Sequence, residues 1–151
     1  LDLREFRDLT ELRCVTEALA LRLSIERGDL QWETTLIAAH HRLTKTPRRT
    51  GADHTQINEE WSMAHRAFHQ ALLAACACEP MIRLANSLAL STDLYRRWAA
   101  PAVAAVRRDV EQEHRDILEA ALSRDAARAS GLLREHYEET ARVVLSSGLA
   151  G

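Results

Sequence analysis

The sequence predicts an all-α protein, a six-helix antiparallel bundle with a central cavity. Apolar residues recur at three- and four-residue spacing along nearly the whole chain, and no segment shows the sustained alternation that is typical of a strand. Of the 151 residues, 46% are hydrophobic and 28% are charged, with only five Gly and three Pro. This composition is typical of an ordered protein, and the length fits a single domain over residues 1–151.

Six helices are expected, separated by glycine, proline or capping residues, at about 8–27, 30–45, 58–78, 81–99, 103–123 and 126–147. Between the second and third, the segment TPRRTGADHTQI contains few apolar residues and is predicted to be a long loop. The first helix should carry an apolar side formed by Leu9, Leu12, Leu19 and Leu23. The inward stripe of the fifth is predicted to contain Val103, Val106, Val110, Ile117, Leu118 and Ala121.

Charge and cysteine content narrow the class of protein. A formal net charge of -2 provides no basic field that would draw the chain itself to nucleic acid or to an anionic membrane. Three cysteines without a CxxC spacing argue against a disulfide framework. No leader and no apolar run of membrane-spanning length is found, so we expect a cytoplasmic protein without a membrane partner. Because the chain starts with Leu1 rather than Met, we also expect it to be part of a longer protein.

Four of the seven histidines interrupt apolar helix faces. His65 and His69 are four residues apart and therefore share one face, which also carries Trp61 and Phe68. His114 and His136 each interrupt the apolar stripe of a later helix. The other three are expected to be solvated, at positions His40, His41 and His54.

These four histidines are candidate metal ligands. For any one of them alone, a core histidine satisfied by one hydrogen bond is the simpler interpretation. Several buried imidazoles leave many ring nitrogens in need of partners, however, at roughly 1–3 kcal/mol for each unsatisfied group. A shared ion satisfies them together, and helical bundles build metal sites from side chains that project inward. Imidazole ligands suit Zn, Ni, Cu or Fe.

Enzymatic motifs are weak in this sequence. The segment HRAFH lacks the glutamate that a zinc protease of the HExxH type uses as its base. Glu111 and His114 form a single ExxH motif, whereas a di-iron carboxylate bundle needs two. No glycine-rich phosphate loop and no GxSxG motif is found. We therefore predict that the protein is not an enzyme; a metalloenzyme with Glu113 or Glu135 beside the metal is the less favoured alternative.

Three stretches together resemble a known family: ELRCVTEALALRLS, AHRAFHQALLAACACEPMIRLANSL and EQEHRDILEAALSRDAARASGLLREH. They are similar to the FCD effector-binding domain of GntR-type bacterial transcription regulators, and the similarity covers essentially the whole chain. The most specific part is the last stretch, in which His136 follows His114 by twenty-two residues. The resemblance implies a bundle of six or seven helices that follows a winged helix-turn-helix domain, which this chain lacks. That upstream domain would bind operator DNA, and the regulator would be a homodimer.

The resemblance also implies a metal site. Many members hold a divalent metal with one Asp and three His, and the metal helps to bind the carboxylate of a small organic acid. The three family histidines match His69, His114 and His136, whereas His65 stands at the Asp position. An all-imidazole set favours Zn, with Ni or Cu as alternatives, over Mn or Mg. Without a protein carboxylate on the ion, the site should attract an anionic effector more strongly.

Arg13, Asn86 and Arg96 are predicted to contact the effector, since arginine binds carboxylates in bidentate fashion. Arg13 and Glu17 match an Arg and a Glu of the family pattern, although an ordinary ion pair on the helix surface explains them as well. The function predicted is a ligand-sensing domain that controls DNA binding by the upstream domain. A metal-free dimerisation domain, or a sensor of an apolar or acyl ligand, is the alternative.

Overall fold

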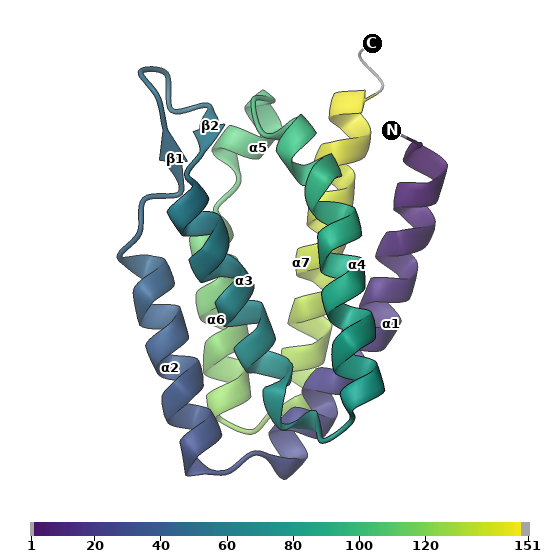
Figure 1. The fold of residues 1–151 in the computed structure, drawn as a ribbon, viewed down its shortest axis with the longest axis vertical. Coiled ribbons are helices and arrows are strands. Elements are labelled where there is room, and N and C mark those ends of the chain that lie inside the picture. Colours follow the sequence, from purple (N-terminus) through teal and green to yellow (C-terminus); the bar gives the residue numbers. More distant parts are fainter. Residues whose placement is uncertain (1, 149–151) are drawn as a thin grey trace.

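The computed structural model describes residues 2–148, which form a bundle of mostly antiparallel helices (Figure 1). Its α-helices are α1 Leu3–Arg27, α2 Leu30–Thr44, α3 Glu59–Leu73, α4 Glu79–Ala99, α5 Val103–Arg107, α6 Val110–Leu122 and α7 Ala126–Gly148. A short 3-10 helix, Ala74–Cys76, links α3 to α4. The prediction of an all-α bundle is confirmed. Within residues 2–148, none of the helices is both long enough and apolar enough to cross a membrane.

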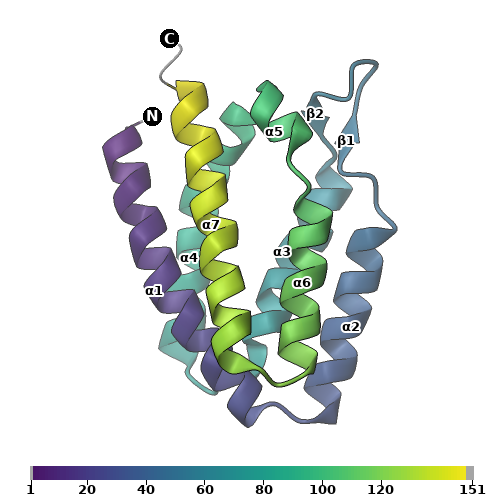
Figure 2. The ribbon, with the colours of Figure 1, turned by 180° about the vertical axis from the view of Figure 1, so that it is seen from behind.

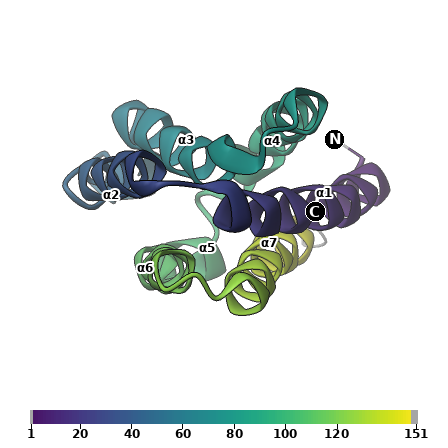
Figure 3. The same cartoon turned by 90° about the horizontal axis from the view of Figure 1, so that it is seen from below.

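The helices form two outer pairs with α1 and α2 between them (Figure 3). Viewed along the bundle, α3 and α4 lie on one side and α6 and α7 on the other. Helix α1 packs against α4 and α7, and α2 packs against α3 and α6. In Figure 2, which shows the molecule from behind, α6 and α7 lie in front and are flanked by α2 and α1. Inward side chains of α3, α6 and α7 therefore face one another across the interior.

The core is one continuous cluster that runs through most of the bundle. Its fully buried members include Leu21, Leu36, Phe68, Leu72 and Ile117, which come from the four helices α1, α2, α3 and α6. A smaller cluster near the chain termini is formed by Phe6, Tyr95, Ala99 and Val144. Burial of large aliphatic and aromatic side chains stabilises such a fold by roughly 1.5–3 kcal/mol for each side chain. The core thus holds the polar interior residues in a rigid frame.

A β-hairpin lies within the predicted long loop. Strands β1, Arg49–Thr50, and β2, Gln56–Ile57, pair in antiparallel fashion with Arg49 opposite Ile57. Gly51 begins the connection with a φ of 89°, a conformation that glycine adopts readily. The Arg49 guanidinium donates to the carbonyl oxygen of Ala100 at 2.9 Å. The hairpin is thereby held against the end of the bundle that carries α5 (Figure 1).

Several helix boundaries differ from the prediction, and α3 ends at Leu73 and not at 78, because a 3-10 helix follows it. Helix α1 begins at Leu3 rather than near Asp8, because the Asp2 side chain caps it by accepting from the backbone amides of Arg4 and Glu5. The single helix predicted over 103–123 is two helices, α5 and α6. Between them the backbone is extended at Arg108, and Asp109 starts α6 by accepting from the amide of Gln112.

The predicted apolar stripes of two helices are partly wrong. Leu12 and Leu19 of α1 are exposed, and so are Val103 and Val106 of α5. The buried side of α1 carries other residues instead, among them Phe6, Cys14, Ala18, Ala20, Leu21 and Ile25. Helix α1 carries apolar residues on more than one side, and periodicity alone does not indicate which side meets α7. The C-terminal half of the fifth stripe is correct, since Ile117, Leu118 and Ala121 are buried.

Candidate metal centre

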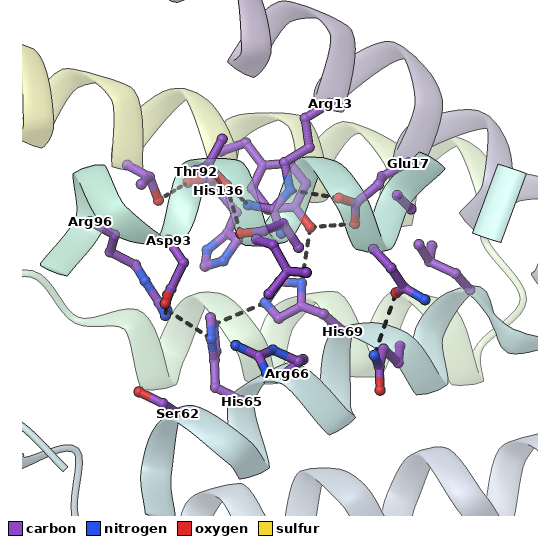
Figure 4. A pocket seen from close by; sticks show the side chains of 18 residues that line it. Arg13, Glu17, Ser62, His65, Arg66, His69, Thr92, Asp93, Arg96 and His136 are labelled. Carbon is purple, nitrogen blue, oxygen red and sulfur yellow. Dashed lines mark hydrogen bonds and ion pairs between the residues drawn. The ribbon is translucent and has the colours of Figure 1, made fainter. Parts of the chain in front are cut away.

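The four predicted histidines meet in the interior of the bundle (Figure 4 shows three of them). The Nε2 atom of His65 lies 3.0 Å from that of His69 and 3.2 Å from that of His114. The Nε2 atoms of His69 and His114 are 3.3 Å apart, and one ring nitrogen of each of the four, His136 included, lies within 4.8 Å of the others. Nitrogens in tetrahedral coordination around Zn, at about 2.0–2.1 Å from the ion, are about 3.3 Å apart. The spacing therefore fits a metal ion.

The chemistry of the cluster also fits a metal. His69, His114 and His136 are 6%, 2% and 5% exposed, and His65 is partly buried. When two neutral imidazole nitrogens meet, one hydrogen lies between them. Three Nε2 atoms at these distances cannot all be paired in this way, so lone pairs of neighbouring rings face each other. A cation at their centre converts this repulsion into coordination.

Burial keeps these imidazoles neutral. It lowers the pKa of His65, His69 and His114 well below the ordinary value of 6.5, and the charges of neighbouring histidines and arginines lower it further. Burial also lowers the pKa of His136 to about 4, although the hydrogen bond from His136 to Glu113 opposes this change. The neutral form carries the lone pair that binds a metal, so the ligands are ready at neutral pH.

A hydrogen-bonded chain orients His69. Its Nδ1 lies 3.0 Å from the Tyr137 hydroxyl, which donates to Oε1 of Glu17 at 2.5 Å. Because the tyrosine hydrogen is used on the carboxylate, the hydroxyl oxygen accepts from His69 Nδ1–H, and the lone pair of His69 is on Nε2. Arg13 donates from Nε to Glu17 at 2.6 Å and holds the carboxylate in place.

Glu113 does the same for His136. The Nδ1 of His136 lies 2.8 Å from Oε1 of Glu113, and Arg108 donates to both oxygens of that carboxylate at 2.7 and 3.0 Å. Burial alone would raise the pKa of Glu113, but the hydrogen bonds from His136 and Arg108 bring it down to about 2. Glu113 is therefore an acceptor throughout the physiological range, and His136 presents its Nε2 lone pair to the cluster.

His65 is held in the opposite way. The Arg96 guanidinium lies 2.8 Å from His65 Nδ1, and a guanidinium only donates. His65 Nδ1 is thus the acceptor, and its hydrogen is on Nε2, directed at the other histidines. Arg96 is itself paired with Asp93, and the Trp61 ring stacks on His65 with centroids 4.5 Å apart. In this arrangement His65 donates to the cluster, whereas the other histidines offer it lone pairs.

A cavity of about 260 Å³ opens beside the cluster (Figure 4). It is lined by His65, His69 and His136 and by all three predicted effector contacts, Arg13, Asn86 and Arg96. Arg13 donates to the Thr92 hydroxyl at 2.9 Å in addition to Glu17, so this ion pair is internal and not a surface pair. Leu73, Ala85 and Leu90 make part of the wall apolar.

Sequence reasoning missed the groups that orient the histidines. Tyr137 follows His136 directly, yet it serves His69 on another helix. Glu113 precedes His114, yet it serves His136. Both contacts join residues that are distant in the chain, so no local pattern predicts them. Three histidines are expected to be solvated, and His41 and His54 are indeed exposed. The prediction is wrong for His40, because its Nε2 is buried and has no partner among the described residues.

Comparisons with known proteins agree with this architecture. A family model described as the FCD domain matches residues 8–139. The "Uncharacterized HTH-type transcriptional regulator BphR" of Paraburkholderia xenovorans (strain LB400) is 37% identical over 153 residues, which cover 99% of this chain and 60% of that protein. The "HTH-type transcriptional repressor GlaR" of Escherichia coli (strain K12) is 32% identical over 136 residues, which cover 88% of this chain and 61% of that protein.

A solved structure has the same fold. A transcriptional regulator, a GntR family member from Pseudomonas syringae pv. tomato str. DC3000, superposes on the whole chain with a TM-score of 0.80 at 20% identity. The chain spans about 60% of the length of these proteins. All three are named as transcriptional regulators, which supports the prediction that the domain is not an enzyme.

Proposed function

The chain belongs to the FCD domain family, and from this premise we propose that it is the metal-dependent, ligand-sensing domain of a GntR-type transcription regulator. The observation that carries the proposal is the convergence of three neutral imidazoles, two of them oriented by Tyr137 and Glu113, on one point beside a cavity that contains two arginines. Neither feature alone indicates a sensor. Together they provide a place for a cation and, next to it, a place for an anion.

The proposed metal ligands are Nε2 of His69, His114 and His136, with His65 as a fourth when Arg96 releases its Nδ1. Zn is favoured, with Ni or Cu as alternatives, because every candidate ligand is an imidazole. The bound ion would supply positive charge to the wall of the cavity. The protein's part is to hold the imidazoles in the neutral form and in the correct orientation through Tyr137 and Glu113.

The proposed effector is a small organic acid. Arg13 and Arg96 direct guanidinium groups along the cavity wall, and Asn86 adds an amide whose oxygen accepts from Gln70 at 3.4 Å. Glu17 and Asp93 already neutralise much of the charge on these two arginines. The metal would therefore be the main attraction for a carboxylate, and the arginines would orient it. The apolar wall leaves room for the rest of the molecule.

Exposed apolar stripes support a homodimer. Leu12, Val15 and Leu19 lie three and four residues apart on α1, and they are exposed. On the adjacent α4, Leu90, Leu94 and Trp98 form a second exposed stripe. We propose that these stripes pair with those of a second copy. Effector binding would then change the arrangement of two upstream domains on operator DNA in the cytoplasm.

Metal content tests the centre. The chain is purified without chelator, and bound metals are measured by inductively coupled plasma mass spectrometry. We expect close to one Zn, Ni or Cu per chain, and its loss in His114→Ala and in His136→Ala. His41→Ala, which removes an exposed histidine of α2, is the matched control and should keep the metal. Trace metal in the parent chain, or equal content in all variants, would refute a metal centre.

Thermal shift measurements with a panel of small carboxylates test the effector. Stabilisation by a carboxylate that disappears after chelation supports the proposal, since a ligand stabilises only the state that binds it. Stabilisation that survives chelation would indicate the metal-free alternative, as would stabilisation by apolar or acyl compounds alone.

A further inference from the structure

A second cavity, of about 370 Å³, lies on the other side of the histidine cluster. It is bounded by the end of α2, the segment before β1, and the beginnings of α3 and α6. His114 lines this cavity, whereas His65, His69 and His136 line the first one. The two cavities are therefore separate, and a molecule in the second would approach the cluster from behind His114.

The second cavity contains a partly buried positive charge that forms no ion pair with any described residue. Arg48 lines it, and within residues 2–148 no carboxylate forms an ion pair with Arg48. One terminal nitrogen of Arg48 reaches only the carbonyl oxygens of Ala105 and Arg108, both at 3.5 Å, and its Nε is buried without a partner. Burial, followed by the charges of Arg49, Arg108 and Arg96, lowers the pKa of Arg48 to about 10, although the charge of Glu113 opposes this change. Arg48 is still charged at neutral pH, so its charge is poorly compensated.

Two histidines present further groups to the same space. His40 lines the cavity, and its buried Nε2 has no partner among the described residues. The Nε2 of His114 points into the cluster, and no residue of 2–148 forms a hydrogen bond with its Nδ1. His69 and His136 each have an acceptor at the corresponding atom. The outer nitrogen of His114 lacks the acceptor that a metal-bound histidine usually has.

The acidic residues of this cavity are engaged elsewhere. Asp109 accepts from the backbone amide of Gln112 as the cap of α6, and Glu111 pairs with Arg115 on the surface. Arg108, the other arginine in the wall, has its charge balanced by Glu113. Lys45 adds a positive charge at the exposed side. The deep part of the cavity thus offers donors and positive charge but no acceptor of matching charge.

We propose that the second cavity binds a small oxyanion, a phosphate or carboxylate group, between the Arg48 guanidinium and His114 Nδ1. Guanidinium groups recognise both kinds of anion by charge-assisted hydrogen bonds. The anion would compensate Arg48 and give His114 its missing acceptor. Only this second contact rests on the proposed metal centre, because the need of Arg48 for an anion exists without a metal.

The test uses the 151-residue chain after metal has been chelated and the chelator removed, so that no ion can attract the probe to the first cavity. Inorganic phosphate, sulfate and acetate are titrated in turn by calorimetry, against sodium chloride of equal ionic strength. We expect saturable binding of at least one oxyanion. In Arg48→Met the affinity should fall about tenfold or more, which is the loss expected for one hydrogen bond to a charged group. Arg134→Gln, which removes an exposed arginine of α7, should bind as the parent does.

The melting temperature provides a second readout, and its value without oxyanion does not depend on binding. Arg48→Met removes a poorly compensated charge, so without oxyanion its melting temperature should equal or exceed that of the parent. Added phosphate should then raise the melting temperature of the parent. It should raise the melting temperature of Arg48→Gln less than that of the parent, or not at all. Equal oxyanion responses in the parent and in both Arg48 variants would overturn the proposal, as would no response beyond that to sodium chloride. Metal content is unaffected by either result, so a failure here is distinguishable from a failure of the metal centre.

Discussion

His65 and His69 are one turn apart on the same face of α3, yet their outer nitrogens have opposite partners. His69 Nδ1 meets the Tyr137 hydroxyl, which leads to the Glu17 carboxylate. His65 Nδ1 meets the Arg96 guanidinium. The first contact places the lone pair of His69 on Nε2, and the second places the hydrogen of His65 there. An acceptor behind the ring thus prepares His69 as a metal ligand, whereas a donor behind the ring prepares His65 to donate.

The difference arises from the helices that lie behind each ring. Glu17 comes from α1 and Tyr137 from α7, and both are buried among residues that fix them. Arg96 comes from α4 and is held by Asp93 on the same helix. A residue at the same helical face can therefore be a ligand or a donor, and the neighbouring helix decides which.

The largest contrast should appear when each histidine is removed. We expect His69→Ala to weaken Zn binding by about 100-fold or more, because it removes an oriented ligand, whereas His65→Ala should keep affinity within about tenfold of the parent. Competition with a chromophoric chelator measures both values, and circular dichroism confirms that the variants stay helical. Equal losses in the two variants would show that His65 is a ligand of the same kind as His69.

Acid should affect His65 and His69 in the same way, because burial is the main cause of the lowered pKa and is common to all four histidines. His136 has a pKa of about 4 in the folded chain and 6.5 as its ordinary value. Between these pH values the unfolded chain binds more protons, so the free energy of unfolding decreases as the pH falls from 6.5 to 4. The effect is about 3 kcal/mol for His136 alone.

Urea unfolding of the chelated chain at pH 7 and pH 5 measures the part of this decrease that falls between these pH values, about 2 kcal/mol. The window avoids Glu113, whose pKa of about 2 places its own contribution below pH 4.5. His136→Gln should show a smaller decrease than the parent. An equal decrease in that variant would mean that the fold does not lower the pKa of His136.

Tyr137→Phe tests the acceptor behind His69. The substitution keeps the ring and removes the hydroxyl, so His69 Nδ1 and the Glu17 carboxylate both lose a partner. Loss of such a partner lowers metal affinity by about 10- to 100-fold. The control is Tyr95→Phe, whose hydroxyl donates to the Asp2 carbonyl far from the cluster. It should leave Zn affinity unchanged.

Arg96→Met tests the donor behind His65, and the expected effect is the smallest. Without the guanidinium, the hydrogen of His65 can move to Nδ1, and Nε2 becomes a ligand. Zn affinity should rise by a few fold, on the order of 1 kcal/mol or less, while stabilisation by carboxylates should decrease. A decrease in Zn affinity would indicate that Arg96 supports the centre and does not oppose it.

The sequence determined the fold class, the positions of most helices and the four histidines that meet, because three- and four-residue periodicity and the identity of the side chains are local properties. It also identified Arg13, Asn86 and Arg96, which do line the cavity beside the cluster. Periodicity did not determine which apolar side of α1 is buried, since that depends on where α4 and α7 lie.

Only the tertiary structure decided what each histidine can do. The proton on an imidazole follows its hydrogen-bond partners, and these partners come from helices distant in the chain. The break at Arg108 is an example, because it starts α6 one turn before Glu113, and Arg108 and His136 then meet on that carboxylate. Among the described residues, the same assembly leaves Arg48 without an ion pair and its Nε without a hydrogen-bond partner. Spacing along one helix is set by the sequence, whereas the charge that faces a buried group is set by packing.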